Sequence, residues 1–142
     1  MLFARVKRSD PEKVFVVAKN SYDTASLTAG QPVIWDYAAD ADGVGVTKPT
    51  AECGIACAGI TVGTIATGDY GLFQVYGYNA DAIVDGGTDV AAGNPLTMNA
   101  AAFELYFLST ASNAVLDQPC GFALAAITAA TAAATAIFVK CL

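Results

Sequence analysis

The chain has 142 residues, the length of one ordinary domain, and 55% of them are apolar whereas only 14% are charged. A soluble helical bundle needs charged outer faces, so this composition disfavours one and favours short strands and turns. The sequence contains no histidine, which excludes Ser–His–Asp and Cys–His catalysis within the chain. We therefore expect a structural protein that packs against other proteins and is not an enzyme.

The net charge of −6 is unevenly distributed. Residues 1–19 carry a net charge of +3, and the remaining residues carry −9. An acidic body repels phosphates, so we expect no binding to nucleic acid. The basic residues near the start could instead dock on an acidic protein surface, or they could form a solvated terminus. The candidate partner-binding residues are Arg5, Lys7, Arg8 and Lys13.

Strand-like segments, which are β-branched, aromatic or alternating in polarity, recur along the chain. In chain order they are 13–19, 32–37, 53–64, 71–78, 80–84 and 103–108. Pro32 stands at the start of its segment, where a missing N–H group does least harm.

The segment 38–50 is expected to be a loop because it contains Asp40-Ala41-Asp42-Gly43. This run invites comparison with a calcium loop. However, aligning Gly43 with the EF-hand glycine places Ala38 and Pro49 at the first and last ligand positions. Neither can supply a side-chain ligand, so the run predicts a turn.

Further turn signals fall at 67–69, 85–87 and 92–95, and the spacing of about ten residues is typical of β-sandwiches and barrels. We therefore predict a mainly β fold: a small β-barrel or β-sandwich-like domain over residues 11–142. A short N-terminal arm (residues 1–10) and long loops complete the prediction.

Residues 121–139 carry no charge, but nine are Ala and three are Thr, which is a weak signal for membrane insertion. The early cluster of Arg5, Lys7 and Arg8 interrupts any apolar leader. We expect no membrane span. Residues 123–136 have high helix propensity, yet the flanking apolar runs favour strand–loop–strand over a helix.

The four cysteines are Cys53, Cys57, Cys120 and Cys141. Only Cys53 and Cys57 have a spacing near that of a zinc knuckle, so we expect no metal site. On one strand this pair would stand about 13 Å apart, too far for a disulfide with each other. A hairpin centred on the Ala/Thr loop would instead place Cys120 opposite Cys141. Intramolecular bonds, intermolecular bonds and buried free thiols all remain open for the four residues.

The carboxylates mostly stand beside Gly, Asn or Thr, as turn residues do, and none forms an evident catalytic pair. The sequence contains no phosphate-binding loop, dinucleotide fingerprint or nucleophile elbow. We expect no cofactor.

One segment of the chain is Thr67-Gly68-Asp69-Tyr70-Gly71-Leu72-Phe73-Gln74-Val75-Tyr76-Gly77. It is similar to a strand of the form gdyGlvqvyG in the capsid decoration (cement, or head-stabilising) proteins of tailed bacteriophages. The turn Ala91-Ala92-Gly93-Asn94-Pro95-Leu96 and the ends Gly121–Ala125 and Ile137–Leu142 match further family patterns. So do Gly59–Val62, Ser9–Val14 and Ala29–Asp36.

The resemblance implies a virion structural protein, made in the host cytoplasm, that stabilises the assembled capsid from its outer surface. Its implied partners are the major capsid protein, at capsomer junctions, and further copies of itself in a trimer. The basic N-terminal arm would lie on the shell. The alternatives are a tail-associated virion protein, or a carbohydrate-binding β-module that uses Trp35, Tyr76 and Tyr78 as an aromatic platform.

Overall fold

The computed structural model describes residues 12–50, 56–87, 89–99, 102–108, 118–128 and 131–141. Within those ranges the chain forms strands and turns and no α-helix, which confirms the prediction of a mainly β fold. The strands are β1 (Lys13–Asn20), β2 (Pro32–Trp35), β3 (Gly45–Thr47), β4 (Cys57–Thr61), β5 (Tyr70–Val84), β6 (Pro95–Met98), β7 (Leu105–Phe107), β8 (Gly121–Ala123) and β9 (Ala133–Lys140).

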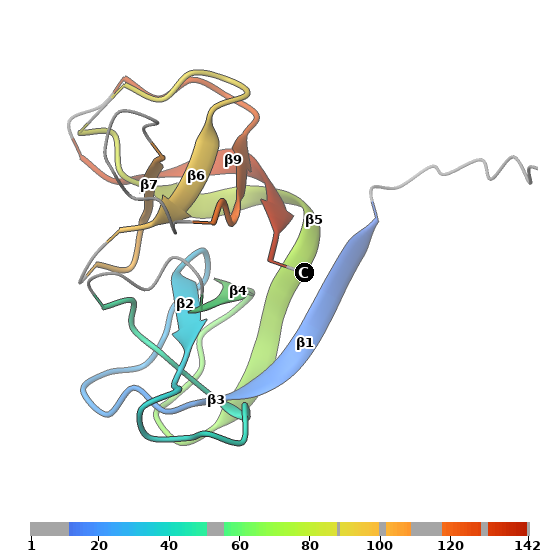
Figure 1. Cartoon of the computed structure of the whole chain (residues 1–142), viewed down its shortest axis with the longest axis vertical. Coiled ribbons are helices and arrows are strands. Elements are labelled where there is room, and N and C mark those ends of the chain that lie inside the picture. Colours follow the sequence, from blue (N-terminus) through green and yellow to red (C-terminus); the bar gives the residue numbers. More distant parts are fainter. Residues whose placement is uncertain are drawn as a thin grey trace, which may run out of the picture.

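The strands form two closed rings that share β5 (Figure 1). The first ring is β1-β3-β2-β4-β5 and closes through the β1–β5 pairing. The second is β5-β7-β6-β8-β9 and closes through β5–β9. All these pairings are antiparallel except β1–β3 and β5–β7, which are parallel. Ring closure hides strand edges that would otherwise be free to pair with other chains.

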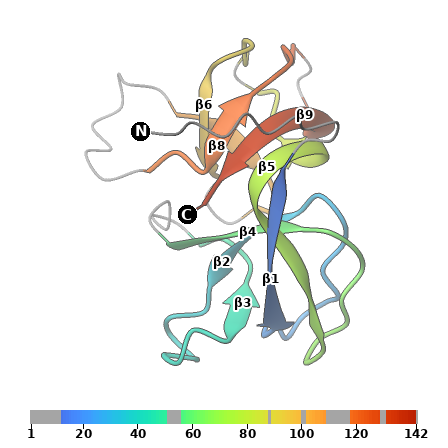
Figure 2. The same ribbon diagram turned by 90° about the vertical axis from the view of Figure 1, so that its right-hand side faces the viewer.

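The shared strand β5 has 15 residues and curves from one ring into the other (Figures 1 and 2). A bulge between Asn79 and Ala82 in its pairing with β9 accompanies this curvature. Gly77 on β5 lies opposite Lys13, the first residue of β1, and its φ of 99° suits glycine. A Cβ atom there would overlap the carbonyl oxygen of Glu12, so only glycine lets the two strands approach so closely.

Each ring encloses apolar side chains. Phe73, Leu27 and Val46 are fully buried in the first ring. The larger cluster fills the second ring and reaches into the first through Ile34 and Ile60. The two rings are therefore packed against each other as well as joined by β5.

The structure confirms most of the predicted strands and adds two. The segments at 32–37 and 103–108 contain β2 and β7, and the described part of 53–64 contains β4. The segment 13–19 forms β1, which extends one residue further, to Asn20. The predicted segments 71–78 and 80–84 are one strand, because the bulge bends β5 without ending it. The strands β3 and β6 fall where loop and turn were expected, and each is short and is held by partners far away in the sequence.

The ambiguous C-terminal region is a strand pair, β8 and β9, as favoured over a helix. The predicted turn at residues 40–43 is also confirmed. The backbone N–H of Asp42 donates to the Asp40 carboxylate at 3.2 Å, which is turn chemistry.

Candidate interaction surface

An exposed apolar row crosses three neighbouring strands on the outside of the first ring. Val17 on β1 lies directly opposite Leu72 on β5. On the other side of β5, the backbone N–H of Val62, just after β4, donates to the Leu72 carbonyl at 3.1 Å. The exposed fractions of Val17, Leu72 and Val62 are 66%, 48% and 44%. Opposed residues on antiparallel strands share a face, so the three side chains form one strip facing solvent.

Two aromatic side chains extend this strip. Phe15 and Tyr70 lie on the same strands, two residues from Val17 and Leu72, and both are exposed. We call Phe15, Val17, Val62, Tyr70 and Leu72 the apolar face. Contiguous exposed apolar side chains on a folded domain mark a site of contact with another surface.

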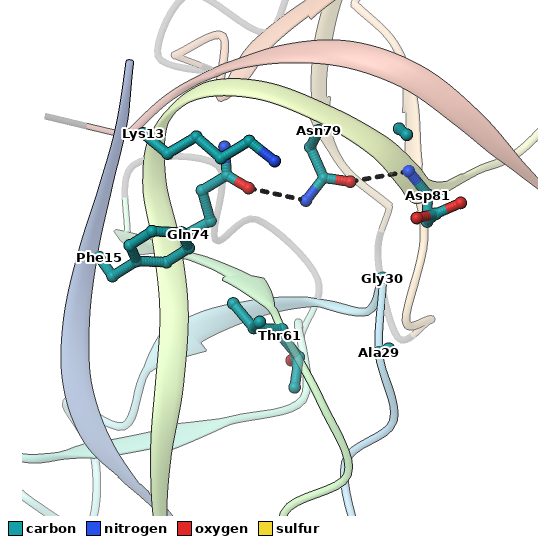
Figure 3. A pocket seen from close by; sticks show the side chains of 10 residues that line it. Lys13, Phe15, Ala29, Gly30, Thr61, Gln74, Asn79 and Asp81 are labelled. Carbon is teal, nitrogen blue, oxygen red and sulfur yellow. Dashed lines mark hydrogen bonds between the residues drawn. The ribbon is translucent and has the colours of Figure 1, made fainter. Parts of the chain in front are cut away.

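A pocket of about 180 Å³ adjoins the apolar face and shares Phe15 and Val62 with it (Figure 3). The remaining lining residues come from β1, from the chain before β2, from the end of β4, and from β5 at and before its bulge: Lys13, Ala29, Gly30, Thr61, Gln74, Asn79, Ala80 and Asp81. This pocket is smaller than a typical small-molecule site, so it suits one side chain of a docked protein.

The polar floor of the pocket is fixed by hydrogen bonds. The buried Gln74 amide donates to the carbonyl oxygens of Tyr76 and Tyr78, at 3.1 and 3.0 Å. Its oxygen accepts from the Asn79 side chain, and the Asn79 oxygen accepts from the Asp81 backbone N–H (Figure 3). These groups satisfy one another and hold the bulge of β5 in shape.

Of the predicted partner-binding residues, Lys13 lies at the rim of this pocket, and its Nζ is 5.9 Å from the centre of the Tyr78 ring. Arg5, Lys7 and Arg8, with the predicted arm 1–10, lie outside the described residues.

The aromatic platform suggested for a carbohydrate site is divided. Trp35 packs against the core of the first ring. Tyr76 packs edge-on against Phe138, with ring centres 5.1 Å apart, and Tyr78 carries Lys13 over its ring. These contacts use the aromatic residues for packing within the chain.

Three cysteines meet where the two rings join, whereas Cys53 lies outside the described residues. The Sγ atoms of Cys57 and Cys141 are 2.9 Å apart, and the Cys141 thiol lies 3.5 Å from the Cys120 carbonyl oxygen. All three are free thiols. The hairpin pairs Gly121 with Val139, which puts Cys120 opposite Lys140 and not opposite Cys141. The predicted hairpin is therefore confirmed, but its register differs by one residue from the predicted register.

The three thiols perturb one another. Burial, reinforced by hydrogen bonds with Cys120 and Cys141, raises the pKa of Cys57. Hydrogen bonds from the Cys141 and Cys57 thiols lower the pKa of Cys120, and the bond with Cys120 raises the pKa of Cys141. The pKa of Cys57 and that of Cys141 are thus shifted upward, whereas the pKa of Cys120 is shifted downward.

Across the described ranges, no group of three or more His, Cys, Asp or Glu side chains could hold a metal ion. Helices long and apolar enough to cross a membrane are likewise absent from the part of the chain that the structure describes.

The apolar face was not among the predictions from the sequence. The signal was present in β1 and β5, because both carry apolar residues on both sides of the strand and not on alternate positions only. Such a pattern indicates either a strand buried on both faces or a strand with one apolar face exposed to solvent. Only the ring geometry distinguishes these two arrangements.

Among solved structures, the fold is similar to the crystal structure of the N base of head fiber gp8.5 in bacteriophage phi29. The two have a TM-score of 0.55 and 15% sequence identity, and the match covers 92% of this chain and 96% of that chain. At this identity the likeness concerns the fold. No protein-family model matches the sequence, and no curated protein matches it.

Proposed function

We propose that this chain is a structural protein of a bacteriophage virion. The observation that carries the proposal is the fold shared with the N base of a phage head fiber over nearly the whole of both chains. The independent sequence resemblance to phage decoration proteins points to the same class. A structural, non-enzymatic role also suits a chain that has no histidine and no evident catalytic pair of carboxylates.

Within that class, the proposed role is capsid decoration: binding to the outer surface of the assembled shell at capsomer junctions. A protein that binds the assembled shell and not its separated subunits stabilises the shell by mass action. The exposed apolar face, with Lys13 and Lys19 on the same strand β1, offers a surface for that contact. Trimerisation would cover part of the remaining apolar surface.

Purified protein mixed with undecorated capsids tests this role. Co-sedimentation with the shell and a rise in the melting temperature of the shell are expected. The absence of both capsid binding and a shift in the melting temperature, at micromolar protein, would contradict decoration. Light scattering of the free protein tests the trimer, and a monomer at all concentrations would contradict it.

The proposed arm is tested by deleting residues 1–10, which removes Arg5, Lys7 and Arg8 while leaving Lys13 in place. Capsid binding should weaken, and the loss should be larger at low salt than at high salt because exposed charges are screened. Unchanged binding at moderate salt would show that the arm makes no contact with the shell.

A further inference from the structure

The seam between the two rings contains a pair of thiols from strands far apart in sequence. Cys57 is the first residue of β4 in the first ring, and Cys141 follows β9 in the second ring. The backbone N–H of Cys141 donates to the Val75 carbonyl at 2.9 Å, which fixes Cys141 against β5. The end of β9 lies between the two rings in both views (Figures 1 and 2).

The two sulfur atoms are already close to bonding distance. Their separation is 2.9 Å, whereas a disulfide bond is about 2.05 Å long. The backbone bond of Cys141 and the pairing of Cys57 with Ile34 hold both residues in place. Little movement is therefore needed to join them.

We propose that Cys57 and Cys141 are an oxidation site of the folded protein and form a disulfide that locks the two rings together. The oxidant is a low-molecular-weight disulfide. One cysteine thiolate attacks a sulfur of the oxidant, which releases a thiolate and leaves a mixed disulfide. The second cysteine thiolate then attacks the protein sulfur of that mixed disulfide and releases the second thiolate. The protein loses two protons and two electrons, and the oxidant is reduced to two thiols.

Cys120 is the third thiol at the seam, and it is the alternative partner for a disulfide within the chain. The pKa of Cys120 is lowered, which favours its thiolate, but its side chain is only 2% exposed. Cys57 and Cys141 are partly exposed, so a dissolved oxidant reaches those two more readily. The strand register also places Cys120 opposite Lys140. The expected product therefore leaves Cys120 as a thiol.

The bond would close a large loop, because the two cysteines are 84 positions apart. Cross-links that close long loops restrict the unfolded chain most. It would also prevent the two rings from separating at the end where β9 leaves the sheet. For a protein of this size, we expect the melting temperature to rise by on the order of 10 °C on oxidation.

The test uses the full chain, reduced and then incubated with glutathione disulfide. Alkylation under denaturing conditions should find two free thiols in place of four. Peptic peptides analysed by mass spectrometry should contain a Cys57–Cys141 cross-link that disappears on reduction. A cross-link that joins Cys120 or Cys53, or glutathione adducts without an internal bond, would overturn the proposal.

Four alanine variants provide matched controls. Cys57→Ala and Cys141→Ala should each abolish both the internal bond and the melting shift, whereas Cys53→Ala and Cys120→Ala should retain both. If a buried-site variant fails to fold, the peptide map of the wild-type chain still decides the pairing. A melting shift that survives in Cys57→Ala would also overturn the proposal.

Discussion

Val17 and Leu72 lie directly opposite each other on β1 and β5, yet both side chains are largely exposed to solvent. In most β-domains such a cross-strand pair either faces the core or is polar. Here the pair stands at the centre of the apolar face and continues onto Val62.

Replacing Val17 and Leu72 by lysine should weaken capsid binding at least about tenfold, because central apolar contacts dominate protein interfaces. The free energy of unfolding should change by only about 0.5 kcal/mol per site, since both side chains are exposed. Co-sedimentation and urea unfolding measure the two effects. Leu124→Lys is the control, because Leu124 is similarly exposed (41%) but lies beyond β8 in the second ring. Equal losses in both variants would exclude the apolar face as the specific contact.

Gly77 should not tolerate alanine. The substitution places a Cβ against the Glu12 carbonyl at a φ of 99°, and we expect the protein to lose about 3 kcal/mol or more of stability. Gly43→Ala is the matched control: its φ is 71° but no atom lies within 4 Å of the added carbon, so about 1 kcal/mol should be lost. Urea unfolding of both variants gives the comparison, and equal values would mean that the close approach of β1 contributes nothing.

The Gln74 amide supports the bulge of β5, so Gln74→Leu should destabilise the protein by about 1–3 kcal/mol. The variant leaves the Asn79 amide and two backbone carbonyls without their partner. Hydrogen exchange should rise at Asn79 and Asp81 more than in β6 or β8. Exchange that rises evenly over the whole chain would indicate general destabilisation and not a local support. Gln118→Leu is the control, because Gln118 is exposed.

The reduced protein should lose stability as the pH rises above about 8.5, where thiols of the unfolded chain ionise. Burial raises the pKa of Cys57, and the bond with Cys120 raises that of Cys141, so the native state keeps protons that the unfolded state releases. Cys120 acts in the opposite direction: its lowered pKa makes stability rise with pH up to about 8.5 and adds nothing further above it.

Urea unfolding between pH 7.5 and 9.5 in a phosphine reductant measures this slope. The reduced Cys57→Ala/Cys141→Ala double variant should show a shallower decline of stability with pH, because it lacks the two thiols whose pKa is raised. Identical slopes would mean that these two thiols do not cause the loss of stability at alkaline pH.

The class of fold and much of its local structure follow from short-range patterns in the sequence. The alternating and aromatic runs indicated β1, β2, β7 and the C-terminal strand pair, and Asp40-Ala41-Asp42-Gly43 indicated its turn, because each signal lies within a few neighbouring residues. The lack of histidine likewise excluded histidine-dependent catalysis on composition alone.

Which distant segments of the chain meet is a property of the tertiary structure. The strands β3 and β6 have no strong local pattern and exist because the two rings supply partners for their backbone groups. Whether Val17 and Leu72 face a core or solvent depends on how the rings close. The proximity of Cys57 and Cys141 depends on where β4 begins relative to the end of β9, and that is set by their common neighbour β5. These are relations between residues many positions apart, and the local pattern carries no information about them.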